Sequence, residues 1–332
     1  MKKFINEPEA VEKEMIRGML KAYPDRLCEL DCGGVFVRKE KKVDKVAIIS
    51  GGGSGHEPSF SGYIGTGMLD AVAAGAIYTS PAADHIYEGI KSIATEKGVL
   101  MILMNYTGDV MNFEMAAEMA EMEGIKTAMV VTDDDVAVDN SLYTVGRRGV
   151  AGTVLVHKIA GAAAEAGGSL EQVRAAAERA NANIRTMGVA INPSTVPSVG
   201  KPGFELEEDE MEVGIGIHGE PGVFKDKLKS ADEIADMLLD KILADLDYTG
   251  HEVALMVNGS GGTPAMELYV VNQHVHDVLE AKGIRVYRTY VGNYMTSIEQ
   301  EGFSLTLLRL DEELKELLDA PANTPAFKEI RA

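Results

Sequence analysis

The strongest constraint on the fold is a short β-branched run, Lys45–Ser50, that passes directly into the glycine-rich stretch Gly51–Pro58. A second apolar run, Val99–Met104, ends in a similar way in the residues NYTGD, and a third, Thr127–Val131, ends in three aspartates. A helical pattern at Met111–Gly124 lies between the second and third runs. Strands that alternate with helices at this spacing form βαβ units, so the sequence predicts a mostly parallel sheet with ligand-binding loops at its carboxyl edge.

The second half of the chain has its own alternation of strands and helices. It follows a long helical stretch, Thr153–Arg185, and a Pro- and Gly-rich stretch, Asn192–Gly203, which we interpret as a domain boundary. Strict alternation of apolar residues in Glu212–Gly222 predicts a strand. The other predicted elements are helix Ser230–Leu246, strand Glu252–Val257, helix Pro264–Ala281 and strands Ile284–Tyr290 and Ser304–Leu310. Because 332 residues suit two domains, we expect an α/β protein with domains 1–190 and 191–332, each a mostly parallel or mixed sheet flanked by helices.

The charge balance excludes several classes of partner. Asp and Glu outnumber Lys and Arg by 52 to 32, which gives a formal net charge of −20, so phosphate backbones and anionic membranes repel the chain. The N-terminus turns acidic before any apolar segment of a signal peptide, and no apolar run approaches the ~20 residues of a membrane helix. Only two cysteines, Cys28 and Cys32, are present, which indicates a reducing compartment and leaves zinc without ligands. We expect a cytoplasmic protein that binds no nucleic acid, membrane or metal.

The glycine-rich stretch is a candidate binding loop. Its glycines let backbone N–H groups approach a ligand closely. It is not a phosphate-binding P-loop, because Pro58 follows too soon and no Lys is present. A tight turn at the end of a strand also explains the glycines. His56 favours a binding site, since it would lie at the carboxyl edge of a sheet.

Two further positions are candidates for chemistry. Asp109 follows a strand, where a carboxylate serves equally as a turn residue or a helix N-cap. His218 is more unusual, because its face of the predicted strand also carries Gly214 and Gly216, which would leave open space beside the imidazole. Glu220 or Asp109 could orient one ring nitrogen of His218 and leave the other as a nucleophile.

The other histidines and a methionine-rich helix have simpler interpretations. His85 follows a loop at the predicted sheet edge and stays an intermediate candidate. Surface or helix-face positions are expected for His157, His251, His274 and His276. Core packing is expected for Met111, Met115, Met119 and Met122, since methionine fills irregular apolar space.

Several segments together resemble one family, the substrate-binding K subunit of dihydroxyacetone kinases. They span essentially the whole chain in the family's order, at residues 50–58, 105–114, 133–158, 214–222, 292–298 and 304–308. The resemblance implies a kinase that captures the ketone of its substrate covalently. It also implies a homodimer.

The resemblance implies roles for individual residues. In the family, a histidine ring nitrogen adds to the carbonyl of dihydroxyacetone to give a hemiaminal, and the matching residue is His218. His56 matches the proton-transferring histidine and Asp109 the substrate-binding carboxylate and proposed base, so both are candidates for the general base. Covalent capture would reject glycerol, which has no carbonyl. The substrate loop of the family corresponds to Gly53, Ser54, Gly55 and His56.

The resemblance further implies that phosphate comes from a second polypeptide. ATP-using members carry an additional helical nucleotide domain, whereas the sequence here has no recognisable nucleotide site, so we expect no cofactor in this chain. In bacterial members with separate subunits, an L subunit holds ADP and Mg. A phosphocarrier protein of the phosphotransferase system recharges it, which makes the kinase dependent on phosphoenolpyruvate.

Two positions depart from the pattern of the family. Met104 stands where a Lys near the substrate is common, and Phe60 stands where a His is common. Both make the surroundings of the substrate more apolar, so we keep Met104 among the substrate-binding residues and erythrulose as an alternative ketose. The alternative function is that of a non-catalytic, ketose-binding transcriptional co-activator, since the family contains such a paralogue. A co-activator could lose His56 or Asp109, and the presence of both favours the enzyme.

Overall fold

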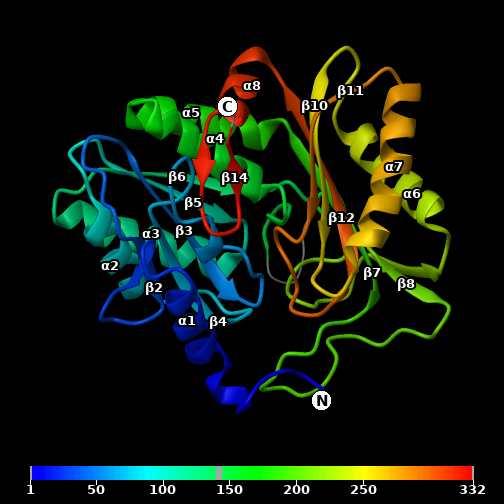
Figure 1. Cartoon of the computed structure of the whole chain (residues 1–332), viewed down its shortest axis with the longest axis horizontal. Coiled ribbons are helices and arrows are strands. Elements are labelled where there is room, and N and C mark those ends of the chain that lie inside the picture. The colour runs from blue at the N-terminus through cyan, green and yellow to red at the C-terminus, as the bar shows by residue number, and fades with distance from the viewer. Residues whose placement is uncertain (1, 140–143, 331–332) are drawn as a thin grey trace.

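The computed structural model describes residues 2–139 and 144–330, which form two six-stranded sheets flanked by helices (Figure 1). The first sheet has the strand order β1-β2-β4-β3-β5-β6. Strands β3 to β6 pair in parallel, and β1 and β2 add an antiparallel edge. The bounds are β1 Leu27–Glu29, β2 Val35–Arg38, β3 Ala47–Ser54, β4 Ala71–Ile77, β5 Val99–Met104 and β6 Thr127–Thr132.

The second sheet has the order β11-β10-β12-β7-β8-β9. Only β10 and β11 pair in parallel within it, and the other neighbours are antiparallel. Both sheets are therefore mixed, which confirms the predicted fold class. The bounds are β7 Ile184–Asn192, β8 Glu210–Val213, β9 Phe224–Lys227, β10 Glu252–Gly259, β11 Arg285–Gly292 and β12 Glu301–Leu310, with a small hairpin of β13 Ala322–Asn323 and β14 Lys328–Glu329.

The helices form three layers around the two sheets (Figure 1). Helices α2 and α3 pack on the outer face of the first sheet, and α6 and α7 on the outer face of the second. Helices α4 and α5 contribute to the core that joins the sheets. The bounds are α1 Val11–Ala22, α2 Ala83–Ile93, α3 Thr107–Met122, α4 Thr153–Glu165, α5 Leu170–Ala182, α6 Ala231–Asp245, α7 Ala265–Ala281 and α8 Glu312–Asp319, with 3-10 turns at Pro8–Ala10 and Ser61–Tyr63.

Helix α4 is buried along almost its whole length. The apolar cluster around it contains Ile48 and Ile102 of the first sheet together with Met256 and Leu308 of the second. A helix that is apolar on all sides can be stable only where other elements cover every side. The two halves of the chain therefore share one continuous core.

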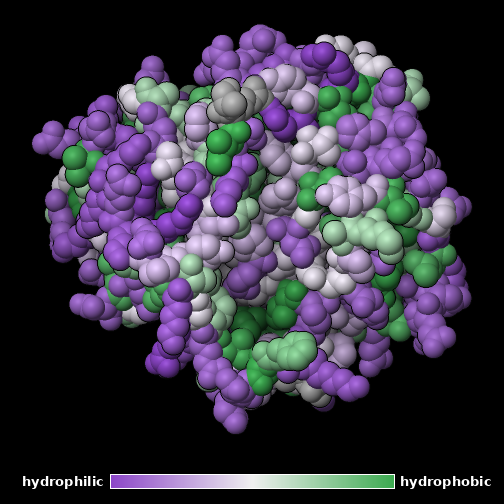
Figure 2. All heavy atoms as spheres, viewed as in Figure 1, coloured by the Kyte–Doolittle hydropathy of each residue, from purple (hydrophilic) through white to green (hydrophobic). Residues whose placement is uncertain are grey.

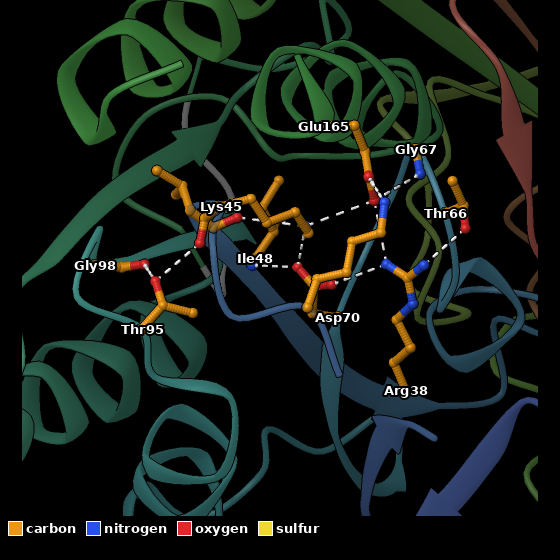
Figure 3. A network of polar contacts seen from close by, with 11 residues as sticks. Arg38, Lys45, Ile48, Thr66, Gly67, Asp70, Thr95, Gly98 and Glu165 are labelled. Carbon is orange, nitrogen blue, oxygen red and sulfur yellow. Dashed lines mark hydrogen bonds and ion pairs between the residues drawn. The ribbon is translucent and has the colours of Figure 1, made fainter. Parts of the chain in front are cut away.

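A buried ionic network ties the end of α4 to the first sheet (Figure 3). The carboxylate of Asp70 accepts from Lys45 at 2.5 Å and from Arg38 at 3.4 Å. Arg38 also pairs with Glu165 at the end of α4, at 3.1 Å, and donates to Thr66 at 2.7 Å. Buried charges are tolerated when they are paired and hydrogen-bonded, as these are. The network fixes the position of α4 against β2, β3 and β4.

The predicted helical stretch over residues 153–185 forms two helices, with a break between Glu165 and Leu170 and an end at Ala182. The chain leaves α4 at Gly167, which has a φ of +86° that few other residues adopt. Helix α5 then runs only to Ala182, and the strand β7 follows at once. The predicted domain boundary between residues 190 and 191 falls inside β7, and the division of the chain there stays a prediction.

The predicted strand over residues 212–222 ends early, at Val213. Gly214 has a φ of +73° and turns the chain, and β9 pairs back on β8. His218 therefore lies in the loop between β8 and β9 and not on a strand face. Two other bounds also moved: β3 continues through the glycines to Ser54, and α3 begins at Thr107 and includes Asp109.

Two expectations about side chains were confirmed only in part. His157 is fully buried, whereas His251, His274 and His276 are exposed or half-buried. Of the four methionines of α3, Met119 is half-buried and packs against the core. The other three are not core residues, since Met111, Met115 and Met122 are 56%, 54% and 85% exposed. Smaller or more rigid side chains pack against the sheet from this helix, namely Phe113, Ala116 and Ala120.

Polar and charged side chains cover most of the face in Figure 2, as the acidic composition requires. Green apolar side chains stand out on the right, in the region of α7. On that helix, Met266, Tyr269 and Val270 are each more than half exposed. Across the described ranges, no helix has the length and apolar character that a membrane span needs.

Candidate active site

A cleft of about 390 Å³ opens where loops of the two halves of the chain meet. The loop after β4, the start of α3 and the loop between β8 and β9 form its walls. It is lined by Tyr78, Ser80, Tyr106, Thr107, Gly108, Asp109 and His218. The fold thus brings together Asp109 and His218, two candidates from distant parts of the sequence.

A buried chain of charged groups holds the loop of His218. The Arg148 guanidinium is 2% exposed and binds Asp135 through Nε at 2.7 Å and Glu220 through Nη1 at 3.3 Å. Glu220 in turn accepts the backbone N–H of His218 at 2.8 Å. Glu220 therefore fixes the backbone of the loop, which differs from the predicted role of orienting the imidazole.

The space beside Gly216 is occupied, contrary to the expectation of a gap next to the imidazole. A Cβ atom at Gly216 would lie 1.7 Å from Oε1 of Glu220 and 2.8 Å from Nη1 of Arg148. Only glycine leaves room for this ion pair. The absence of a side chain at residue 216 thus serves the positioning of the loop.

The imidazole of His218 is surrounded by aromatic rings. The ring of Tyr106 lies edge-on at a centroid distance of 4.4 Å, that of His56 at 4.8 Å and that of Tyr78 at 5.5 Å. Burial, helped by the positive charge of Arg148, lowers the pKa of His218 to about 3. His218 is therefore neutral near pH 7 and keeps a ring nitrogen with a free electron pair, as a nucleophile requires.

His56 lies behind the cleft and is fully buried. Its Nδ1 is 2.9 Å from the carbonyl oxygen of Thr296, which can only accept, so Nδ1 carries the proton. Burial and the neighbouring His218 lower the pKa of His56 to about 3. In the neutral ring Nε2 is then an acceptor, and it has no hydrogen-bond partner among the described residues. His56 is a proton acceptor with an unused site.

Asp109 lies in the first turn of α3 and is 3% exposed. Burial raises the pKa of Asp109 to about 7, although a hydrogen bond with the side chain of Ser80 opposes the shift. Its Oδ1 has no hydrogen-bond partner among the described residues. A carboxyl group that titrates near pH 7 with a free oxygen suits proton transfer.

The glycine-rich segment supports the site from the end of β3. Ser54 donates its hydroxyl to the carbonyl of Gly75 at 2.7 Å, and Gly55 donates its N–H to Glu57. A Cβ atom at Gly53 would lie 2.6 Å from the backbone nitrogen of Thr79. The glycines thus allow the loop after β4 to approach His56 closely.

Met104 and Phe60 lie in the core and are not among the residues that line the cleft. Both pack beside Gly52, where a Cβ atom would lie 2.8 Å from the ring of Phe60 and 3.8 Å from Cε of Met104. Phe60 also contacts the buried ring of His157 at a centroid distance of 6.1 Å.

Sequence patterns did not single out Tyr78, Tyr106 or Arg148 as residues of the site. Tyr106 stands in the segment 105–114 and Arg148 in the segment 133–158, both of which carried the family resemblance. Residues 140–143 of that second segment lie outside the described residues. Tyr78 follows β4, which no clear pattern predicted. Its position at the site depends on contacts between the two halves of the chain, which no local pattern in the sequence shows.

Comparison with known proteins agrees with the fold. Residues 17–326 match the Dak1 domain. The chain is 50% identical over 329 residues to the dihydroxyacetone-binding subunit of PTS-dependent dihydroxyacetone kinase 1 from Listeria innocua, an alignment that covers 98% of this chain and 100% of that one.

Two solved structures are similar along nearly the whole chain. One is a dihydroxyacetone kinase operon co-activator, with a TM-score of 0.91, 38% identity and coverage of 96% of this chain and 98% of that one. The other is the dihydroxyacetone kinase from C. freundii in complex with AMP-PNP and Mg²⁺, with a TM-score of 0.91, 33% identity and coverage of 98% of this chain and 61% of that one. The chain therefore belongs to the Dak1 family of dihydroxyacetone kinases.

Proposed function

We propose that this chain is the substrate-binding subunit of a PTS-dependent dihydroxyacetone kinase. It holds a small ketose as a hemiaminal on His218 and presents the terminal hydroxyl of that ketose to a phosphoryl donor. The observation that carries this proposal is a cleft lined by the neutral imidazole of His218 and the buried carboxyl group of Asp109, with the ring of His56 4.8 Å from that of His218. The family and the PTS-dependent relative from Listeria innocua support the reaction class.

In the capture step, a neutral ring nitrogen of His218 adds to the carbonyl carbon of the ketose. One C–N bond forms, the π bond of the carbonyl breaks, and the carbonyl oxygen takes up a proton. The other ring nitrogen of His218 releases a proton, so the adduct stays neutral. His56 is placed to carry this proton, because its Nε2 is an unpartnered acceptor on a ring 4.8 Å from that of His218.

In the transfer step, the terminal hydroxyl oxygen attacks the phosphorus of the donor. A new O–P bond forms, the bond from phosphorus to the leaving ADP oxygen breaks, and the hydroxyl proton moves to Asp109. We assign Asp109 as the general base because it lines the cleft, its Oδ1 has no hydrogen-bond partner among the described residues, and its pKa is raised to about 7. This assignment leaves His56 to the capture step.

The proposed partners follow from the two steps, because this chain captures the ketose and another protein donates the phosphoryl group. The phosphoryl donor is a separate L subunit that carries ADP and Mg, and a phosphocarrier protein of the phosphotransferase system recharges it. The PTS-dependent relative, aligned over its full length, supports a donor on another polypeptide. The reaction would take place in the cytoplasm, where phosphoenolpyruvate is available.

We also propose a homodimer. An apolar groove of about 200 Å³ between β7, α6 and α7 supports it, since exposed apolar surface of this kind marks protein interfaces. Light scattering after size exclusion tests the proposal, and a monomer at micromolar concentration would contradict it.

The second candidate function is that of a ketose-binding co-activator. The similarity to the co-activator structure favours it. A co-activator needs only to capture the ketose and does not need to transfer a phosphoryl group. Because Asp109 has the properties of a base for that transfer, it favours the kinase. Erythrulose remains the alternative to dihydroxyacetone as substrate.

Native mass spectrometry tests the capture step directly. The chain is mixed with dihydroxyacetone, erythrulose or glycerol. We expect a mass increase of one ketose with at least one of the first two and none with glycerol. An assay with the L subunit and its phosphorelay then separates the kinase from the co-activator, because only the kinase yields a phosphorylated ketose.

A further inference from the structure

Tyr78 lies between the two histidines of the site. Its ring stacks on that of His56 at a centroid distance of 5.3 Å and an interplanar angle of 21°. The same ring meets that of His218 edge-on at 5.5 Å and 88°. Aromatic pairs in these geometries attract each other and restrict each other's orientation.

The two edges of the Tyr78 ring pack against two glycines, Gly55 and Gly219. A Cβ atom at Gly55 would lie 3.0 Å from Cε1 of Tyr78, and one at Gly219 would lie 3.5 Å from Cε2. Gly55 precedes His56 and Gly219 follows His218. The tyrosine ring therefore sets the separation of the two backbone segments that carry the histidines.

The hydroxyl of Tyr78 joins the two halves of the chain. It forms hydrogen bonds with Ser194 at 3.0 Å and with Ser297 at 2.8 Å, in two loops of the second half. Burial raises the pKa of Tyr78 to about 12, so the hydroxyl keeps its proton. Ser297 neighbours Thr296, whose carbonyl binds the ring of His56. The hydroxyl thus acts on the same loop that fixes the His56 tautomer.

The backbone of Tyr78 is strained. Its φ of +58° is in the left-handed region, where a bulky residue is an outlier. Its N–H donates to the carbonyl of Ser54 at 3.0 Å, which holds the chain in this conformation. Strained residues persist when surrounding contacts determine them, and they concentrate at functional sites.

We propose that Tyr78 is a positioning residue that sets the distance and angle between His56 and His218, and so the rate at which ketose is captured. The inference rests on the proposed function, because it gives Tyr78 a role in the same capture step. Tyr78 takes no part in bond making. It acts by keeping the proton acceptor next to the nucleophile.

Two variants distinguish the contribution of the Tyr78 ring from those of its hydroxyl and its backbone conformation. Tyr78→Asn removes the ring and keeps a residue that tolerates a positive φ, so the turn can still form. Tyr78→Phe keeps the ring and removes only the hydroxyl. We expect Tyr78→Asn to slow adduct formation by about 10²-fold, the cost of a misplacement of about 1 Å, and Tyr78→Phe to stay within about threefold of the wild type.

The readouts are the rate of adduct formation by native mass spectrometry and the NMR signals of the histidine rings. In the wild type we expect cross-relaxation between the His56 and His218 rings, and in Tyr78→Asn its loss with the rest of the spectrum preserved. Ser297→Ala tests the hydroxyl link separately and should resemble Tyr78→Phe. Capture at the wild-type rate by folded Tyr78→Asn, or unchanged ring signals, would overturn the inference.

The design also separates this inference from the proposed function. If the wild type forms no adduct with any ketose, the proposed function fails, whereas the NMR comparison still reports whether Tyr78 positions the rings. If the wild type forms an adduct and Tyr78→Asn forms it equally fast, only the role of Tyr78 fails.

Discussion

The imidazoles of His56 and His218 stand almost perpendicular, with centroids 4.8 Å apart and an interplanar angle of 85°. The two residues come from loops of different sheets and are far apart in the sequence. Their close approach creates a neutral nucleophile beside a neutral proton acceptor.

His218→Ala should abolish ketose capture and leave the fold intact. The imidazole contacts rings at the edge of a cleft, whereas Arg148, Glu220 and the backbone hold the loop. Native mass spectrometry measures the adduct and circular dichroism the fold. His251→Ala, at an exposed position, is the control. A ketose adduct on His218→Ala would mean that another residue is the nucleophile.

Asp109→Asn should keep ketose capture and lower phosphoryl transfer by about 10²–10⁴-fold, because Asn has the same size but cannot accept a proton. The measurement is kcat with the L subunit and relay in excess. In the wild type, kcat should rise with pH through about 7, as Asp109 loses its proton. Near-wild-type transfer in the variant would return the role of base to His56.

The buried carboxyl group of Asp109 should also make stability depend on pH. Its pKa is raised from 3.8 to about 7 in the folded chain. The protonated form is therefore favoured by folding, and this contribution is complete below the ordinary pKa and is lost as the pH rises through about 7. The Tm of the wild type should fall relative to that of Asp109→Asn between about pH 4 and pH 7. Asp240→Asn, exposed on α6, should show no such trend. A constant difference between wild type and Asp109→Asn would contradict the raised pKa.

The isolated chain should not phosphorylate ketoses with ATP and Mg. The cleft lined by Tyr78, Asp109 and His218 lies where loops meet, and the glycine-rich segment belongs to β3 and is not a P-loop. A coupled assay compares the chain alone with the chain plus the ADP-loaded L subunit and its relay. Turnover with ATP and this chain alone would refute the proposal of a separate donor.

Met104→Lys tests the substrate-binding role that the resemblance assigned to Met104. A substrate contact would shift the kcat/KM ratio of dihydroxyacetone to erythrulose by roughly tenfold. Met104 is 1% exposed in the core, so we expect instead a loss of several kcal/mol of stability with an unchanged ratio. Urea unfolding measures the change in stability, and the kcat/KM values for the two ketoses show whether the ratio has shifted. Met122→Lys, at an 85% exposed position of α3, is the control for the added charge.

Local patterns predicted the parts of this protein that depend on neighbours in the sequence. The run before Gly51 identified β3, and the run Val99–Met104 identified β5, because strand periodicities extend over a few residues. The resemblance assigned His56, Asp109 and His218; Asp109 and His218 line the cleft, and His56 lies against His218. For the second sheet, a mixed arrangement of strands was predicted only as the alternative to a mostly parallel one.

Local sequence patterns could not predict the contacts between distant segments. The pairing of β9 on β8 moved His218 into a loop, and the ion pair of Arg148 with Glu220 filled the space beside it. The methionine stripe of α3 looked like a core face, yet the opposite face with Phe113 fits more closely against the sheet. Tyr78 had no pattern of its own, since its role depends on two glycines 164 positions apart, Gly55 and Gly219.

The burial of α4 between the two sheets has a consequence for how this protein would work as a kinase. Many kinases close one lobe over another to exclude water from the phosphoryl group. Here the lobes share a core through α4, so a hinge between them would expose apolar residues such as Ile102 and Met256 to solvent. We therefore expect that the two halves do not close over the cleft, and that the protein that delivers the phosphoryl group also shields it from water.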